Sequence, residues 1–375
     1  MDNPVFRAAS CRSCRSPTGE VVLDLGRQPA CDYFPTADSP VADPVHPLVM
    51  WICSACGLAQ LVDDPTVPEE PKGVEPQALV RQAADAVARV EAVGLLRPGG
   101  TVAEYCSPHG GSWLGLLAGR GVVPVSGSAR ADLIVDCFGM MHAADQAASL
   151  DERAARLAPG GTLLLQYHSL ETIVRHRQWN ALRHGHYAYY STTALVAMLS
   201  AAGLHARTAW TFDLYGGTVL LAAGRDADGP GSPDEAVTEL LAKEERTRIT
   251  DPRTLATLQD AARDQANVLR DWLEASRAAG QAVLGYGAAS RAVALLHIAG
   301  VDSGLLPAVA DASPAKQGLR MPGSSIPVIS PDELIAKRPA AVLLFVDDLL
   351  AEVRASYPQI EAAGGRWVPA GAQAG

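Results

Sequence analysis

Two cysteine pairs near the N-terminus constrain this chain most, because each pair has the spacing of a metal-binding knuckle. Cys11 and Cys14 form the first pair, and Cys53 and Cys56 form the second. Four thiolates from two such turns make the tetrahedral sulfur set that zinc prefers. Because all four positions are cysteine, we predict a structural zinc ion, with a set of reduced thiols without metal as the alternative. Cys31, inside the loop between the pairs, is predicted to be packed.

The composition predicts a globular protein with two or three domains. The 375 residues are 48% hydrophobic, which is enough for ordinary cores. No stretch approaches the roughly 18 apolar residues that cross a bilayer, and the first residues lack a secretory apolar region. Seven cysteines without such a signal favour the reducing cytoplasm, and a net charge of -10 argues against nucleic acid as a partner. We therefore expect a cytoplasmic protein that binds neither membranes nor nucleic acid.

Alternating strand and helix signals predict an α/β fold in three parts. Residues 1–62 are expected to form a small zinc-binding module. Residues 77–225 alternate between short strands and helices, which predicts a Rossmann-like parallel sheet with helices on its faces. A Gly/Pro/Asp-rich linker follows. Residues 234–375 are then predicted to form a second Rossmann-like α/β domain, with a long helical lead-in over residues 234–279.

The second α/β unit contains a strand, a glycine turn and a helix. The strand at 282–286 runs into Gly287 and then Arg291, and a second strand ends at Asp311. Such a turn lets a helix N-terminus approach an anion, and an acidic residue about 20 positions later is suited to a ribose hydroxyl. The G-x-G-x-x-G pattern is incomplete, so a glycine turn that serves only packing is the alternative.

Several motifs together resemble the three-domain C-methyltransferases of deoxysugar and natural-product biosynthesis. Gly285 to Ala288 match that family's GYGA-type turn, and Asp311 to Gly318 match its D-x-x-P-x-K-Q-G stretch. The resemblance covers nearly the whole chain. It implies a four-cysteine zinc domain, a central S-adenosylmethionine (SAM) domain and a C-terminal α/β domain. It also implies a nucleotide-linked 4-keto sugar as the small-molecule substrate.

The resemblance also implies a histidine base. The family removes the proton next to the ketone with a histidine in an E-H-x-x-Y/F-x-S context, and residues 186–191 fit that segment. His186 is thus the expected base, with His142 as its partner and Tyr190 in the same catalytic group. An imidazole titrates near neutrality and takes a proton from carbon when the resulting enolate is stabilised. The alternative is that His186 only packs or belongs to a solvated basic face.

A further set of positions is predicted to bind the substrate. Histidines and arginines are concentrated between residues 168 and 186, which is suited to a diphosphate-facing surface. Arg183 stands where the family has a tyrosine beside the base, and Tyr215 stands where it has the histidine of an H-G-G stretch. The predicted substrate-binding residues are Arg183, Tyr215, Tyr286, Arg291, Asp311 and Lys316.

The central domain departs from the family where SAM would bind. Cys106 and Pro108 occupy the loop in which the family has Gly-x-x-x-Gly, and proline removes an N–H group and fixes φ. Ser126 follows the second strand, where an acidic residue is expected to hold the ribose. The short segment before Asp132 has no room for the helix and third strand that enclose adenine. We therefore expect the SAM site to be non-functional, and no cofactor-binding residue is assigned.

These observations favour an enzyme that keeps the family's proton abstraction without its methyl donor. An enolate that is not methylated is reprotonated or expels a β-substituent, which gives isomerisation, epimerisation or elimination. One alternative is an active SAM-dependent sugar C-methyltransferase with an altered SAM pocket. Another is a non-catalytic, zinc-stabilised partner protein, although such a protein has no reason to keep two histidines at the family's catalytic positions.

Overall fold

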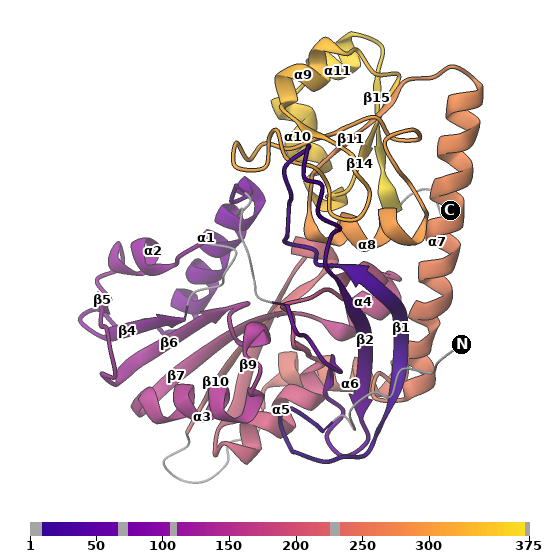
Figure 1. Cartoon of the computed structure of the whole chain (residues 1–375). Helices are drawn as coiled ribbons and strands as arrows, with labels where there is room; N and C mark the ends of the chain where they lie inside the picture. The colour runs from indigo at the N-terminus through magenta and orange to yellow at the C-terminus, as the bar shows by residue number, and fades with distance from the viewer. Residues whose placement is uncertain (1–9, 67–73, 106–110, 226–232, 372–375) are drawn as a thin grey trace.

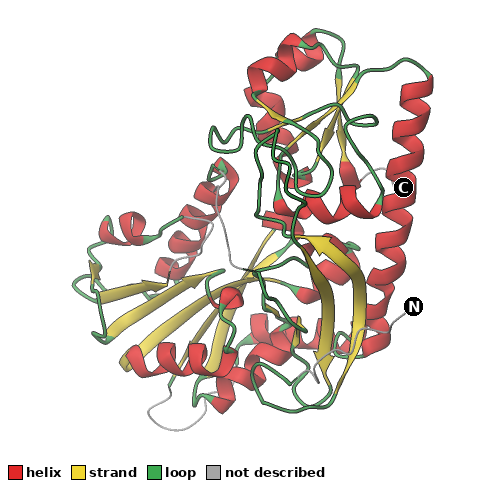
Figure 2. Ribbon diagram, viewed as in Figure 1, coloured by secondary structure: helices red, strands yellow, loops and turns green. Residues whose placement is uncertain are grey.

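The computed structural model of the chain contains three β-sheets flanked by helices (Figures 1 and 2). Within the described residues, no helix combines the length and apolarity that crossing a bilayer demands. Cys106 and Pro108, which were predicted to disrupt a SAM loop, lie outside the described residues. The structure describes residues 10–66, 74–105, 111–225 and 233–371.

The first sheet joins the zinc module to the central part of the chain. Its strands are antiparallel and lie in the order β1-β2-β3-β8. The first three belong to the zinc module, whereas β8 comes from the segment that directly follows His186. Neither β2 nor β8 was predicted from the sequence. The bounds are β1 (Gly19–Pro29), β2 (Val45–Cys53), β3 (Ala59–Leu61) and β8 (Ala188–Tyr189).

The central sheet has the order β5-β4-β6-β7-β10-β9. Strands β5, β4, β6 and β7 are parallel, and β10 runs antiparallel to both of its neighbours. In the described residues no strand lies beyond β5, which has only two residues, as the short segment before Asp132 predicts. The bounds are β4 (Thr101–Tyr105), β5 (Val123–Pro124), β6 (Ala131–Cys137), β7 (Leu157–His168), β9 (His205–Phe212) and β10 (Thr218–Gly224).

Helices cover both faces of the central sheet. Helices α1 and α2 share one hydrophobic cluster with β4, and α3 and α5 share another with β6, β7 and β10. Short 3-10 turns carry several of the predicted site residues. The helices are α1 (Gln77–Ala92), α2 (Leu114–Ala118), α3 (Gln146–Arg156), α4 (Leu170–Arg175) and α5 (Thr192–Ala201), and the 3-10 turns are η1 (Met140–His142), η2 (Trp179–Ala181) and η3 (Leu214–Gly216).

The helical lead-in consists of two helices, α6 (Glu235–Thr247) and α7 (Pro252–Ala278). Arg248, with a φ of 53°, ends the first helix, and a proline begins the second, so the lead-in is broken between Thr247 and Pro252. Helix α6 packs against α5 and β9, whereas α7 packs against β1 and α8. In Figure 1, α7 runs along the edge of the molecule from the zinc module to the C-terminal domain.

The C-terminal domain has an all-parallel sheet in the order β13-β12-β11-β14-β15. Its central strands are apolar and buried, as expected for parallel strands that are covered on both faces. The strands are β11 (Val283–Tyr286), β12 (Val309–Ala310), β13 (Val328–Ile329), β14 (Ala341–Leu344) and β15 (Arg366–Pro369). The helices are α8 (Ser290–Ile298), α9 (Pro331–Ala336), α10 (Leu350–Ser356) and α11 (Gln359–Ala362), with the 3-10 turn η4 (Asp347–Leu349).

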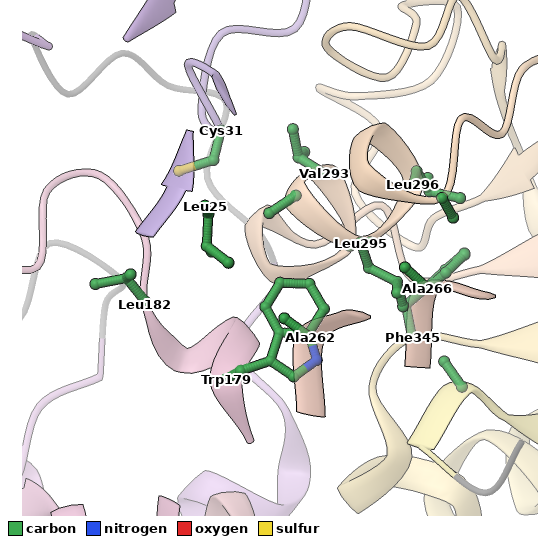
Figure 3. Packing of buried hydrophobic residues seen from close by; sticks show 14 of the residues in the cluster. Leu25, Cys31, Trp179, Leu182, Ala262, Ala266, Val293, Leu295, Leu296 and Phe345 are labelled. Carbon is green, nitrogen blue, oxygen red and sulfur yellow. The ribbon is translucent and has the colours of Figure 1, made fainter. Parts of the chain in front are cut away.

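One hydrophobic core is shared by all three parts of the chain (Figure 3). Trp179, 1% exposed, packs in the same cluster as Ala262 of α7 and Val293 of α8, and its Nε1 donates to Gln265 Oε1 at 2.6 Å. Cys31 of the zinc module is 5% exposed in this cluster, so it is packed as predicted. Because protein interiors are close-packed, this shared core holds the three parts of the chain in fixed positions relative to one another.

Candidate functional site

The four knuckle cysteines meet in one cluster that fits a zinc ion. Their sulfur atoms all lie within 4.8 Å of one another. The Cys11 and Cys56 sulfurs are 3.5 Å apart, and those of Cys14 and Cys53 are 3.6 Å apart. Tetrahedral ligands at a Zn–S distance of about 2.3 Å are separated by about 3.8 Å. The donor set and its spacing therefore match a closed, structural zinc site.

The zinc module holds both histidine-bearing segments of the central domain. Beside the first knuckle, the Arg12 carbonyl accepts from the N–H of Gln146, and the Arg12 guanidinium donates to the Ala144 carbonyl. These contacts fix the chain directly after η1. Beside the second knuckle, β3 pairs with β8, and the Leu61 N–H donates to the Tyr187 carbonyl. The metal site thus supports the segments on which His142 and His186 lie.

The two predicted catalytic histidines are in contact. Their ring centroids are 4.6 Å apart, and the rings are nearly perpendicular at 89°. His142 Nδ1 lies 2.8 Å from the Gly185 carbonyl oxygen, so it carries the proton and donates to that oxygen. The Tyr187 N–H donates to the Met141 carbonyl at 2.8 Å. These two bonds tie the loop around His186 to the turn that carries His142.

Arg183 lies directly against His186. Its Nε donates to His186 Nε2 at 2.8 Å, and its Nη1 donates to Ser290 Oγ at the start of α8. An arginine keeps its charge in proteins, so only a neutral imidazole accepts this bond. Burial and the nearby Arg183 charge also lower the pKa of His142 to about 4, which keeps that ring neutral at pH 7.

A cavity of about 510 Å³ lies where the three parts of the chain meet. Its size is that of a site for a drug-sized ligand. His142 is not in its lining but lies behind it, against the ring of His186. The cavity brings together all of the other predicted catalytic and substrate-binding residues, which are Arg183, His186, Tyr190, Tyr215, Tyr286, Arg291, Asp311 and Lys316.

The C-terminal domain gives the cavity a charged wall with two cations, Arg291 and Lys316, and two carboxylates, Asp311 and Asp348. Arg291 lies 3.8 Å from Asp348, and burial lowers the pKa of Arg291. Burial also lowers the pKa of Lys316, whose Nζ donates to the Ala288 carbonyl at 2.7 Å. The Asp311 carboxylate accepts from a backbone N–H two residues on. Lys316 therefore also stabilises the turn at Gly285 to Ala288, and Asp311 stabilises the loop that follows it.

Tyr215 connects this charged wall to the central sheet. Arg291 lies over its ring, 5.8 Å from the centroid, and the Phe138 ring meets it edge-on at 5.9 Å. Tyr215 itself has a φ of 54°, and two glycines follow it. A Cβ on Gly217, at a φ of 143°, would lie 2.6 Å from Thr172 Cγ2. The turn therefore requires glycine at this position.

The two other cavity tyrosines use their hydroxyl groups within the protein. Tyr190 donates to Gln146 Oε1, and Gln146 Nε2 donates to the Met140 carbonyl at 2.9 Å. Tyr190 thereby braces the turn that carries His142, and its catalytic role stays a prediction. Tyr286 donates to the hydroxyl of Tyr357 at 3.3 Å, so it packs the C-terminal wall.

His168 is a cavity residue that was not predicted. It ends β7 and lines the cavity, with its Nε2 3.1 Å from Gln178 Oε1. Burial and the nearby Arg291 charge lower the pKa of His168 to about 3. The sequence did contain a usable signal, because ligands of α/β domains bind at the carboxyl ends of parallel strands and His168 is the last residue of such a strand.

Near the end of β4, where the family binds SAM, the acidic residue Glu104 is hydrogen-bonded within the protein. The Glu104 carboxylate accepts from the Trp113 N–H and from Ser112 Oγ, each at 2.6 Å. Both of its oxygens are thereby bonded to the start of α2. Ser126 lies two residues after the end of β5, and the described residues place no carboxylate at this position, where the resemblance implies a ribose anchor.

Three protein-family models match the chain in the order of its three parts. "Putative zinc binding domain" matches residues 11–70, "Methyltransferase domain" matches residues 124–209 and "C-methyltransferase C-terminal domain" matches residues 213–370. In all three parts, the chain is therefore similar to zinc-binding C-methyltransferases.

One curated relative is the C-methyltransferase NovU of Streptomyces niveus. It is 29% identical over 236 residues, which cover 62% of this chain and 54% of NovU. The chain thus spans about half the length of the curated relative that it matches.

Similar solved structures include the magnesium protoporphyrin IX methyltransferase ChlM from Synechocystis PCC 6803. It is 12% identical, with a TM-score of 0.30 over 40% of this chain and 84% of ChlM. A SAM-dependent methyltransferase from Thermotoga maritima is 15% identical, with a TM-score of 0.30 over 40% of this chain and 93% of that protein.

Proposed function

We propose that this chain is a cytoplasmic enzyme of natural-product biosynthesis that removes a proton from carbon next to a carbonyl, without SAM. His186 is the base, and the substrate is a nucleotide-linked keto sugar or a related carbonyl compound. The observation that carries the proposal is the contact between His186, His142 and Arg183 at the wall of a cavity of about 510 Å³.

The chemistry follows from the neutral state of His186. When a substrate oxygen draws the Arg183 guanidinium away from His186 Nε2, that nitrogen becomes available to take the proton from the α-carbon. The electron pair of the broken C–H bond moves to the carbonyl oxygen, and the guanidinium stabilises the resulting enolate. Return of the proton to the opposite face of the α-carbon gives epimerisation. Where the α-carbon carries a hydroxyl group, the intermediate is an enediol, and its protonation at the former carbonyl carbon gives isomerisation. Loss of a β-substituent instead gives elimination.

The charged wall of the cavity is suited to the phosphates of such a substrate. Arg183 and Arg291 both line it, and Ser290 begins α8 beside the Arg183 guanidinium. Guanidinium groups bind phosphate oxygens through paired hydrogen bonds, and a helix N-terminus adds backbone donors. This arrangement supports a nucleotide-linked substrate over a neutral ketone.

Three features of the described residues support a reaction without SAM. Both Glu104 oxygens are bonded to the start of α2, β5 has only two residues, and Ser126 is uncharged. A ribose needs an acceptor at the end of the second strand, and adenine needs a wall beyond it.

A second candidate function is SAM-dependent C-methylation of the same substrate. It is favoured by the match to a methyltransferase model over residues 124–209 and by the extent of the cavity. The cavity reaches Gly111 and Trp113 after β4 and Cys137 at the end of β6. A methyl donor at this edge of the sheet would face a substrate bound beside His186.

Two measurements test the proposal. A nucleotide-linked 4-keto sugar incubated with the protein in deuterium oxide should acquire deuterium next to its carbonyl. His186→Asn should slow this exchange by about 100-fold or more, whereas His176→Asn, at an exposed histidine of the same region, should leave it unchanged. Exchange that survives His186→Asn would remove His186 as the base. Calorimetric binding of SAM, with methylated product, would establish the second candidate.

A further inference from the structure

We propose that the end of the cavity next to α1 and α2 binds an apolar group of the substrate. This inference rests on the proposed SAM-independent function, because in a working methyltransferase this end would face the methyl donor. The substrate would then be a two-ended molecule. Its anionic group lies against Arg183 and Arg291, its carbonyl lies beside His186, and an apolar portion extends toward the central sheet.

The residues at this end form an apolar surface that is packed against the core of the central domain. Trp113, 3% exposed, and Ala83, 7% exposed, belong to the core beneath α1 and α2. Apolar side chains from both helices and from the end of β6 complete the surface. The apolar lining consists of Leu79, Val80, Ala83, Trp113, Leu116 and Phe138.

The cationic and apolar linings of the cavity come from different segments. Every cavity-lining residue of α1 and α2 is apolar, namely Leu79, Val80, Ala83 and Leu116. The three cationic side chains, Arg183, Arg291 and Lys316, line the cavity from other segments, together with the carboxylates of Asp32, Asp311 and Asp348. A phosphate therefore has its hydrogen-bond donors on segments other than α1 and α2.

The two ends form one site because Tyr215 joins them. Its ring contacts Arg291 on one side and Phe138 on the other, at 5.8 Å and 5.9 Å between the groups. His186 and Met141 line the same cavity. A ligand that spans the two ends therefore shares the cavity with His186.

Burial of an apolar group at this end should strengthen binding in proportion to its size. Each methylene group removed from water improves affinity by up to about fourfold. The dependence of affinity on the alkyl chain length of an amphipathic ligand therefore measures binding at the apolar end, independently of turnover.

The test is calorimetry with a series of n-alkyl phosphates from ethyl to octyl phosphate, each below its micelle concentration. Octyl phosphate should bind at least about tenfold more tightly than ethyl phosphate. Leu116→Gln, on the cavity side of α2, should remove most of this gain. Leu114→Gln is the matched control, because Leu114 is also half-buried on α2 but does not line the cavity. Val80→Gln on α1 provides a second test at a more exposed position.

The outcomes separate this inference from the proposed function. Equal affinity along the series, or equal losses in the Leu116 and Leu114 variants, would overturn the apolar site alone. SAM that binds and displaces octyl phosphate would overturn the inference together with the SAM-independent function. A rise with chain length that depends on Leu116 and Val80, without SAM binding, is the expected result.

Discussion

At the scale of single residues, burial beside arginine keeps two histidines of the site neutral. The pKa of His142 is lowered to about 4 and that of His168 to about 3, against 6.5 for an exposed histidine. In each case burial is the main cause, and a neighbouring guanidinium adds to it. Below pH 6.5 the unfolded chain therefore binds more protons at these positions than the folded chain does.

The stability of the protein should fall as the pH is lowered through this window. Both pKa values are lower in the folded chain than in the unfolded chain, so protonation favours unfolding. The free energy of unfolding is therefore highest above pH 6.5 and decreases down to about pH 4 for His142 and about pH 3 for His168. Each histidine contributes up to about 1.4 kcal/mol per pH unit. Urea unfolding at pH 7 and pH 5 measures this loss.

His168→Gln should make the same pH dependence shallower, because glutamine does not titrate. His176→Gln, at an exposed site, should leave it unchanged. Identical slopes for wild type and His168→Gln would contradict the neutral, buried state of His168.

At the scale of elements, α6 fixes the start of α5, the helix that follows the His186 segment. Glu244 on α6 is 2% exposed, and its carboxylate accepts from the N–H groups of Thr192 and Thr193, each at 2.7 Å. Free N–H groups at a helix start need acceptors, and a carboxylate also interacts favourably with the helix dipole.

Glu244→Ala should therefore lower the free energy of unfolding by about 2 kcal/mol or more, because it leaves these buried donors without their acceptor. Glu245→Ala, at the exposed neighbouring position, should change it by less than about 0.5 kcal/mol. Urea unfolding of the two variants provides the measurement. Equal effects would show that Glu244 does not act as a cap.

At the scale of the whole molecule, the zinc module connects all three parts. Its sheet includes β8 of the central domain, and its long loop reaches the C-terminal domain (Figure 1). There, Arg320 forms two hydrogen bonds of 2.7 Å with Asp43, and the Arg320 N–H donates to the Pro35 carbonyl. Loss of the metal should therefore disturb the site as well as the module.

Metal analysis should find about one zinc per chain, and removal of the zinc should loosen both histidine segments. Hydrogen exchange read by mass spectrometry should become faster in residues 140–147 and 187–190. Strands β14 and β15 of the C-terminal domain are the internal control and should change little. Less than about 0.3 zinc per chain, or exchange that is unaffected by chelation, would contradict the role of the zinc module.

The sequence by itself determined the features that depend on neighbouring residues. The spacing of the four cysteines predicted the metal cluster, apolar periodicity predicted most helices and strands, and the short segment before Asp132 predicted a sheet without a further strand beyond β5. Such features follow from local geometry, because the chain itself holds together residues that are three positions apart in a knuckle or four positions apart in a helix.

The tertiary structure alone decided which distant segments meet. It paired β8 with β3, brought His142 against His186, and turned the Tyr190 hydroxyl toward Gln146. These contacts depend on how buried faces pack across the whole chain, and β8, with only two residues, carries too little pattern to be recognised before its partner strand is known. The zinc knuckles and most individual helices and strands are therefore encoded locally, whereas the cavity exists only because three separate parts share one core.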